Sequence, residues 1–122
     1  MTEFIENYIQ VWNEPDAATR EKLVRLLWAD DAVEYTGANE YRGHEALDAR
    51  VAKAHNDFVA EGGHVFRLGS EPATHHDAVL INVEMVPAAG GPPAWVFTIV
   101  ALVGSDGRIR QEYQFGRNLA AA

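Results

Sequence analysis

Histidine is the residue type in this sequence with the widest chemical range, because its side chain titrates near neutral pH and also binds metals. His55 falls on an apolar helical face, between Val51 and Phe58. A buried histidine with one hydrogen bond would explain that position, and a proton shuttle beside a pocket is the alternative. We therefore retain His55 as a candidate for proton transfer.

A second group of residues, His75-His76-Asp77, consists of types that ligate metals. Adjacent residues in an extended segment point to opposite faces, and Asp77 is typical of a turn, so we do not expect the three side chains to converge. The chain also has no cysteine, which excludes a disulfide framework, a thiolate nucleophile and a Cys-ligated zinc. We expect neither a metal nor a cofactor.

The composition bounds the number of domains and the kinds of partner. With 122 residues, the chain fits one domain spanning residues 1–122. Its formal net charge of −8 works against binding to nucleic acid or to anionic membrane surfaces, which relies on clustered Lys and Arg. No stretch approaches the roughly 20 apolar residues of a membrane helix. The N-terminus lacks the features of a signal peptide, so we expect a cytoplasmic protein.

Helical patterns occupy most of the first half of the chain. Apolar residues recur at helical spacing within residues 2–13 and again as far as Trp28, and Asp16 between the two patterns can cap the second helix. A third helix begins at His44, and Gly62-Gly63 supply the flexible backbone that ends it. The sequence therefore predicts three helices.

Strand patterns with a period of two dominate the second half of the chain. The predicted strands are residues 32–35, 64–71, 78–86, 94–103 and 108–115. The connections between the later strands are too short for crossover helices, so we expect an antiparallel sheet. Helices segregated from an antiparallel sheet make the predicted class α+β.

Two sequence motifs carry a family resemblance. Ala29-Asp30-Asp31-Ala32-Val33-Glu34-Tyr35, followed by Tyr41-Arg42-Gly43-His44-Glu45-Ala46-Leu47, resembles the nuclear-transport-factor-2-like (NTF2-like) superfamily and, within it, SnoaL-like proteins. The order of elements matches over nearly the full length. The resemblance implies a cone-shaped α+β barrel, in which three helices from the N-terminal half cap a curved antiparallel sheet, and a homodimer formed through the sheet. The superfamily includes ketosteroid isomerases, polyketide cyclases, epoxide hydrolases, dehydratases and non-catalytic modules, so the fold leaves the function open.

Tyr8 lies where the resemblance places the oxyanion-hole tyrosine of ketosteroid isomerases. Those isomerases also carry two aspartates, and the matching positions here hold Thr36 and Ile99. Isomerisation by that mechanism needs a base as well as a hydrogen-bond donor, so Tyr8 alone is insufficient. A core or pocket-wall role for Tyr8 is the alternative. The chain also lacks the Arg-x-Asp pair of limonene-type epoxide hydrolases.

Glu112 is the residue closest to the acid that SnoaL-like cyclases carry on their last strand. Alternation in this strand puts Ile109 and Tyr113 on one face and Glu112 and Gln114 on the other. The preference of apolar side chains for the interior points Ile109, Tyr113 and Phe115 inward, whereas the spacing from the preceding turn points Glu112 and Gln114 inward. If inward, its carboxyl group would be desolvated and could act as an acid. A solvated or dimer-facing glutamate is the alternative.

Large apolar side chains offer either a packed core or the lining of a pocket. A cone of short helices over a curved sheet does not easily fill its mouth, which favours a pocket for a small apolar or aromatic molecule. The predicted lining residues are Trp12, Tyr35, Phe58, Ile81, Val83, Met85, Trp95, Phe97 and Ile99.

Two hypotheses for the function follow. The first is a small-molecule-binding protein with cofactor-free acid–base chemistry, such as isomerisation, cyclisation or dehydration, in which Tyr8, His55 and Glu112 handle protons. The second is a non-catalytic ligand-binding or dimeric assembly module, which the two missing isomerase acids favour. The sequence leaves open which of the two applies.

Overall fold

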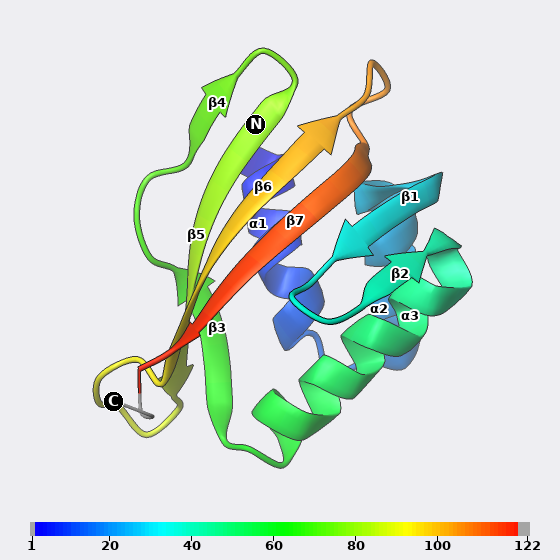
Figure 1. Ribbon diagram of the computed structural model, residues 1–122. Coiled ribbons are helices and arrows are strands. Elements are labelled where there is room, and N and C mark those ends of the chain that lie inside the picture. Colours follow the sequence, from blue (N-terminus) through cyan, green and yellow to red (C-terminus); the bar gives the residue numbers. More distant parts are fainter. Residues whose placement is uncertain (1, 120–122) are drawn as a thin grey trace.

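Among residues 2–119, all helices lie in the first half of the chain (Figure 1). A computed structural model describes residues 2–119. The elements are α1 (Thr2–Asn13), α2 (Ala17–Leu27), β1 (Trp28–Tyr35), β2 (Glu40–Arg42), α3 (Gly43–Ala54), the π-helical segment η1 (His55–Ala60), β3 (His64–Leu68), β4 (Ala73–His75), β5 (Ala78–Pro87), β6 (Trp95–Val103) and β7 (Ile109–Asn118). The three predicted helices are confirmed.

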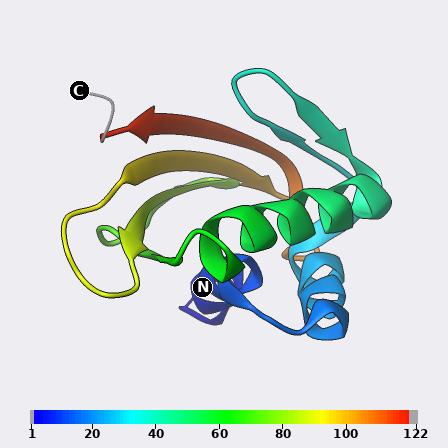
Figure 2. The same cartoon turned by 90° about the horizontal axis from the view of Figure 1, so that it is seen from below.

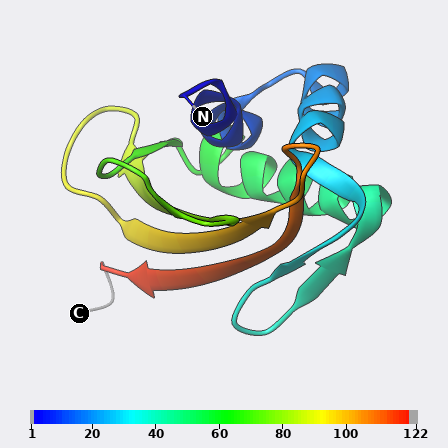
Figure 3. The same ribbon diagram turned by 90° about the horizontal axis from the view of Figure 1, so that it is seen from above.

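The strands form one seven-stranded sheet in the order β2-β1-β7-β6-β5-β3, with β4 paired to β5. The sheet curves around the helices without closing, and the helices cover its concave face (Figures 2 and 3). This arrangement confirms the predicted α+β class with a cone-like shape. One pairing, β1 with β7, is parallel. Short turns force antiparallel pairing only between consecutive strands, and these two strands are far apart in sequence.

The first two helices begin and end where their side chains can satisfy the backbone. Asp16 caps α2, because its carboxylate accepts a hydrogen bond of 2.9 Å from the backbone N–H of Thr19. The helix ends at Leu27, one residue earlier than predicted. Trp28 takes an extended conformation and opens β1, which is therefore longer than the predicted strand.

The predicted third helix is two segments. Its α-helical part, α3, runs into the wider π-helical turn η1 before the chain reverses. Gly62 is required at this reversal, since a Cβ there would lie 2.6 Å from the carbonyl oxygen of Asp57. Gly63 has a φ of 71°, a conformation that favours glycine. The predicted role of the two glycines as the helix end is confirmed.

Two short strands, β2 and β4, were not predicted, because three residues carry too little periodicity to register. β3 also ends at Leu68, earlier than predicted. His76, with a φ of 56°, sits in a turn that folds β4 back onto β5. Asp77 occupies the same turn, as predicted.

Irregular pairing in β1 and β7 determines which side chains face the helices. In β7, Ile109 pairs with Val103 and Gln111 with Leu102, which leaves Arg110 as an extra residue. Such a bulge shifts the alternation by one position, so Ile109 and Glu112 both point inward. Glu112 is therefore buried, as the spacing from the turn predicted, and Ile109 is buried as well. Tyr113 and Phe115, which the apolar pattern pointed inward, are exposed because they follow the bulge. The register of the β1–β7 pairing also shifts beside this bulge, between Ile109 and Gln111 of β7.

The end of α1 is fixed to the sheet edge by one side chain. The Asn13 side chain donates a hydrogen bond of 2.7 Å to the carbonyl oxygen of Phe66 in β3 and accepts one of 2.9 Å from the Phe66 N–H. This pair of bonds satisfies the backbone of an edge strand and holds α1 over the sheet.

Among the helices of residues 2–119, none is long and apolar enough to cross a membrane.

Candidate functional site

A cavity of about 170 Å³ lies between the concave face of the sheet and helices α1 and α3. Its surface is mostly apolar, and we call the following residues the apolar wall: Trp12, Ala54, Phe58, Phe66, Val83, Met85, Trp95, Phe97 and Ile99. Two polar side chains, Arg50 and Gln114, complete the lining. Seven of the nine residues predicted from the sequence to line a pocket border this cavity.

The other two predicted lining residues lie elsewhere. Tyr35 stacks on Tyr113 with ring centroids 5.1 Å apart, away from the cavity lining. Ile81 has no exposed surface and belongs to the packed core below the cavity. Glu34 is the β1 residue that points inward, so its neighbour Tyr35 lies on the outer face of the sheet with Tyr113. Ile81 shares the inner face with Val83 and Met85, but alternation alone does not say how far along a strand the core ends and the cavity begins.

Next to the cavity is a set of polar side chains that we call the acid cluster. It consists of Tyr8, Trp28, Glu34, Arg50, Glu112 and Gln114. The carboxyl groups of Glu34 and Glu112 sit on directly paired positions of β1 and β7, and both side chains have no exposed surface. Two carboxyl groups side by side in a protein interior cannot easily both be ionised.

Glu112 is surrounded by hydrogen-bond donors from three elements. Its Oε2 accepts a hydrogen bond from the Tyr8 hydroxyl, and its Oε1 accepts one of 2.8 Å from the Trp28 indole N–H. The Gln114 amide N–H donates to Oε2 at 3.2 Å. The side chain predicted as a candidate acid therefore points into the molecule, and Tyr8 contacts it directly.

Glu34 is paired with the only cation in the acid cluster described here, Arg50 of α3. The Arg50 Nε donates to Glu34 Oε1 at 2.9 Å, and the guanidinium lies 5.4 Å from the ring centroid of Trp12 and 5.2 Å from that of Tyr41. Burial disfavours the charge of Arg50, but the adjacent Glu34 carboxylate outweighs burial and raises the Arg50 pKa. Arg50 therefore stabilises a negative charge on Glu34.

These surroundings separate the two carboxyl groups chemically. Burial, and then the nearby charge of Glu34, raise the pKa of Glu112 to about 8, against the hydrogen bonds from Tyr8, Gln114 and Trp28. Burial also raises the pKa of Glu34, and Arg50 counteracts this rise. At neutral pH the raised pKa favours a proton on Glu112, and the ion pair with Arg50 favours the negative charge on Glu34, so that an acid lies beside a base.

Tyr8 is fully buried on α1, and its hydroxyl faces both carboxyl groups. Burial raises its pKa well above the ordinary value, and the charges of Glu112 and Glu34 add to the rise. The phenol is therefore neutral and acts as a hydrogen-bond donor.

Gln114 connects the acid cluster to the cavity. Its amide N–H group donates to Glu34 at 3.1 Å and to Glu112 at 3.2 Å, and its carbonyl oxygen accepts from Arg50 at 3.3 Å. The same side chain lines the cavity, whereas neither carboxyl group does. A molecule in the cavity thus meets Gln114 and Arg50 first.

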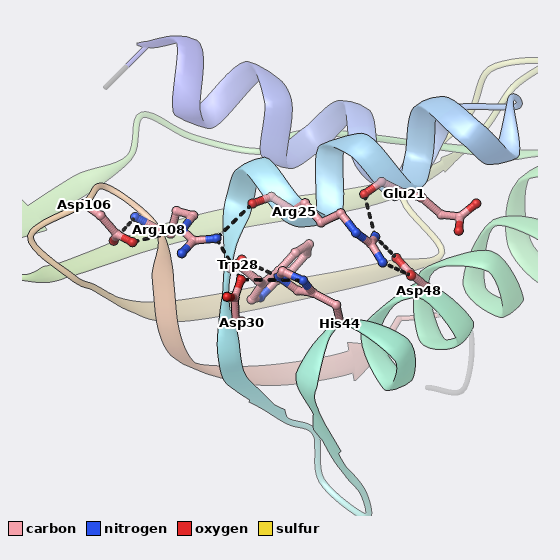
Figure 4. Close-up of polar contacts among 8 residues, drawn as sticks. All are labelled: Glu21, Arg25, Trp28, Asp30, His44, Asp48, Asp106 and Arg108. Carbon is pink, nitrogen blue, oxygen red and sulfur yellow. Dashed lines mark hydrogen bonds and ion pairs between the residues drawn. The ribbon is translucent and has the colours of Figure 1, made fainter.

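Polar contacts on the other side of Trp28 hold its strand in place (Figure 4). His44 of α3 donates from Nε2 to the backbone carbonyl oxygen of Trp28 at 2.7 Å. Arg108, beside the β6–β7 turn, contacts Asp30 at 3.2 Å and Asp106 at 2.9 Å. These contacts tie the beginning of β1 to α3 and to the turn, and so position the indole that donates to Glu112.

The structure does not bring His55, the third predicted proton-transfer residue, to the cavity. His55 is buried at the start of η1 and absent from the cavity lining, and burial lowers its pKa, which favours the neutral ring. The rings of His75 and His76 contact each other at 4.5 Å on an exposed hairpin. Within residues 2–119, no cluster of three or more His, Asp or Glu residues is arranged to hold a metal.

Glu34 and Arg50 were not predicted as site residues from the sequence. Thr36 was considered as the β1 position of an acid, but Thr36 lies beyond the end of β1, and Glu34 is the acid of that strand. One signal in the sequence could have identified Arg50 as a site residue. Arg50 follows Leu47 by three residues and precedes Ala54 by four, which places it on the buried face of the helix, where an arginine needs an anionic partner.

Comparison with known proteins supports the fold through structure alone, since the sequence matches no protein-family model and no curated protein sequence. The structure is similar to a candidate isomerase of the SnoaL-like family from Agrobacterium tumefaciens, with a TM-score of 0.84, 22% identity, and 96% of this chain and 97% of that chain covered. It is also similar to a candidate polyketide cyclase from Sinorhizobium meliloti, with a TM-score of 0.65, 17% identity, and 93% and 94% covered. An NTF2-like protein of unknown function from Exiguobacterium gives a TM-score of 0.69, 17% identity, and 93% and 98% covered. The chain therefore has the NTF2-like fold found in SnoaL-like proteins.

Proposed function

We propose that this protein binds a small apolar or aromatic molecule in the cavity and transfers protons to and from it without a cofactor. The observation that carries the proposal is the pair formed by Glu112 and Glu34, one protonated and one ionised, behind the Gln114 side chain that lines the cavity. Isomerisation, cyclisation and dehydration all need a proton removed at one atom and added at another.

Four members of the acid cluster have a role in such a reaction. Glu34, kept ionised by Arg50, is the base that accepts a proton from carbon. Glu112, protonated at neutral pH, is the acid that returns one. Tyr8 donates a hydrogen bond to Glu112 and so stabilises the negative charge that this side chain carries after it has given up its proton. The ketosteroid isomerase arrangement implied by the resemblance is thus replaced by two glutamates at other positions.

Direct contact between a bound molecule and the carboxyl groups requires movement of one side chain. Gln114 is half-buried and lies between the cavity and both carboxyl groups. Rotation about its side-chain bonds takes nanoseconds or less for a side chain with exposed surface. A ligand oxygen that accepts from Arg50 in place of the Gln114 carbonyl would release this side chain.

The structural neighbours support the proposal at the level of reaction class. Two of them are described as a candidate isomerase and a candidate polyketide cyclase. Both reaction classes depend on proton transfer. Because the identities are 22% and 17%, the neighbours support the fold and leave the substrate open.

Hydrogen–deuterium exchange tests the proposal. The protein is incubated in D₂O with aryl methyl ketones of one to three rings, and exchange of the methyl protons next to the carbonyl is followed by NMR. We expect faster exchange than in buffer, and a rate about 10²–10⁴-fold lower for Glu112→Gln. Glu45→Gln, an exposed glutamate on α3, is the matched control. Equal exchange by the wild type and Glu112→Gln would overturn the catalytic role.

A non-catalytic ligand-binding module is the second candidate function. The observation that favours it is that Glu34 and Glu112 have no exposed surface, so that the acid cluster could serve only to position α1 and α3. The same experiment distinguishes the two candidates. Retention of a ketone without exchange of its protons is the expected result for the binding module.

We also propose a homodimer formed through the outer face of the sheet. Leu80, Val100, Tyr113 and Tyr35 form a row across four paired strands, and Leu80 and Tyr113 are exposed to 36% and 38%. Phe115, next to this row, is exposed to 63%. A contiguous apolar row of this kind on an otherwise charged protein is typical of an association surface.

Light scattering during size-exclusion chromatography tests the dimer. We expect the mass of two chains for the wild type and of one chain for Val100→Glu, which places a charge in the centre of the row. Leu26→Glu, an exposed leucine on α2, is the control and is expected to remain dimeric. A wild-type mass of one chain at working concentration would contradict the proposal.

A further inference from the structure

The size of the cavity limits what it can hold. Its volume is about 170 Å³. A cavity of about 150 Å³ in another protein accommodates benzene. The cavity described here therefore has room for one six-membered ring with a small substituent, and a fused ring system would have to extend beyond it.

The polar groups of the lining lie together rather than scattered. Arg50 and Gln114 are hydrogen-bonded to each other at 3.3 Å. Nη1 of Arg50 donates to none of the residues 2–119, and no buried side-chain nitrogen in that range lacks a partner, so Nη1 is accessible. An accessible guanidinium nitrogen beside an apolar cavity is a donor for an oxygen of the ligand.

A shallow depression on the surface continues from the cavity at this polar end. Arg50, Gln114, Trp95 and Phe97 line both the cavity and the depression. The depression is completed by Thr36, Gly37, Phe115 and Gly116. A ligand oxygen at the junction would thus have its ring on the inner side and any further substituent on the outer side.

The charge of the site favours a neutral ligand. The positive charge of Arg50 is already balanced by Glu34, and Glu112 retains its proton at neutral pH. An anionic ligand would bring a second negative charge close to Glu34 and would lose its hydration in an apolar cavity. A neutral oxygen acceptor incurs neither cost.

We propose that the ligand is a neutral compound with a single six-membered ring and one hydrogen-bond-accepting oxygen. Its ring lies against the apolar wall, and its oxygen accepts from Arg50 at the junction. The inference deepens the proposed function, since it concerns the same cavity, but it requires binding and not proton transfer.

Four probes of related shape test the ligand class by titration calorimetry at pH 7. Benzamide is neutral and has one ring and a carbonyl oxygen; benzoate has the same shape and a negative charge. 2-Naphthamide adds a fused ring, and toluene lacks the acceptor. We expect benzamide to bind at least 10-fold more tightly than each of the other three.

Two leucine substitutions on the same helix locate the binding site. Ala54 lines the cavity, and Ala54→Leu is expected to weaken benzamide binding at least 10-fold by filling it. Ala49 is exposed on α3, and Ala49→Leu is expected to bind benzamide as the wild type does. Circular dichroism of both variants confirms that they are folded.

Each contrary result removes a defined part of the inference. Equal or tighter binding of benzoate overturns the neutral class, equal binding of 2-naphthamide overturns the one-ring limit, and equal binding of toluene overturns the oxygen contact. Absence of benzamide binding overturns the inference as a whole. If the four probes bind as expected but the ketones show no proton exchange, the proposed catalysis is overturned and the inferred ligand class stands. If exchange occurs only with ketones of two or three rings, the proposed catalysis stands and the inferred ligand class is overturned.

Discussion

The apolar wall and the acid cluster border the same cavity but are built in different ways. The wall comes from regular alternation in β5 and β6, where Val83 and Met85 pair directly with Phe97 and Trp95. The acid cluster comes from two irregular strands and depends on contacts such as Tyr8 with Glu112, which are 104 residues apart in sequence. In the proposed function the wall selects the molecules that fit, and the cluster transfers the protons.

The largest expected effect concerns the ionisation of Glu112. Its pKa is raised from 4.5 to about 8, so the folded state binds more protons than the unfolded state between these values. The resulting stability is fully present below pH 4.5 and is lost as the pH rises through 8, by several kcal/mol at about 1.4 kcal/mol per pKa unit.

Urea unfolding of the wild type and Glu112→Gln across this pH range measures the effect. Glutamine resembles the protonated carboxyl group, so the difference between the two proteins is expected to grow with pH in favour of the variant. Exposed carboxylates with lowered pKa values, such as Asp106, contribute in the opposite direction, but equally to both proteins. Parallel pH profiles would show that Glu112 is not held in its protonated form.

Removal of the cation tests whether the cluster needs Arg50. Arg50→Met leaves the fully buried Glu34 without its ion-pair partner, and breaking a buried pair in this way costs about 3–5 kcal/mol. The double variant Arg50→Met with Glu34→Gln is expected to recover part of the loss, because no buried charge is left unpaired. Urea unfolding measures both; an equal loss in the single and double variants would contradict the coupling.

The apolar wall was easier to predict from the sequence than the acid cluster, because the wall lies on regular strands and the cluster on irregular ones. Trp95, Phe97 and Ile99 were predicted to line a pocket, and all three border the cavity, because β6 is a regular strand in which every second side chain faces the same side. The orientation of Glu112 could not be decided, since it depends on the extra residue Arg110 in β7. A bulge of one residue leaves little trace in a single sequence.

Glu34 was missed for a related reason. A glutamate between Val33 and Tyr35 is typical of the solvent face of a half-buried strand, and only its pairing with Glu112 across the parallel β1–β7 contact shows that it is buried. Parallel pairing of the first strand with the last is a long-range feature that local patterns do not contain. The fold itself was predictable, because the order of the elements and the two motifs extend over most of the chain.

Alanine substitutions at two paired isoleucines compare the stability contributed by the apolar wall with that contributed by the packed core. Ile81 and Ile99 are cross-strand partners, but only Ile99 borders the cavity. Replacement of a buried isoleucine by alanine costs about 2–5 kcal/mol. We expect Ile81→Ala near the upper end of that range and Ile99→Ala near the lower end, because Ile99 has fewer packing partners to lose. Chemical denaturation measures both, and equal losses would indicate that the cavity is filled in solution.

The smallest expected effect on stability is at Gly116, where the wall meets β7. A Cβ at this position would lie 3.1 Å from Phe97 Cε1 and 3.3 Å from Trp95 Cζ3, so both rings would have to shift by a few tenths of an ångström. The two rings are stacked with centroids 5.7 Å apart and can move together. Gly116→Ala is therefore expected to change the free energy of unfolding by less than about 1 kcal/mol.

Because both rings also line the cavity, the same substitution is expected to weaken benzamide binding several-fold. Gly37→Ala, where a Cβ would meet no atom within 4 Å, is the control for stability and should leave the free energy of unfolding unchanged. A loss of stability without a change in affinity would mean that the position of these rings does not determine what the cavity accepts.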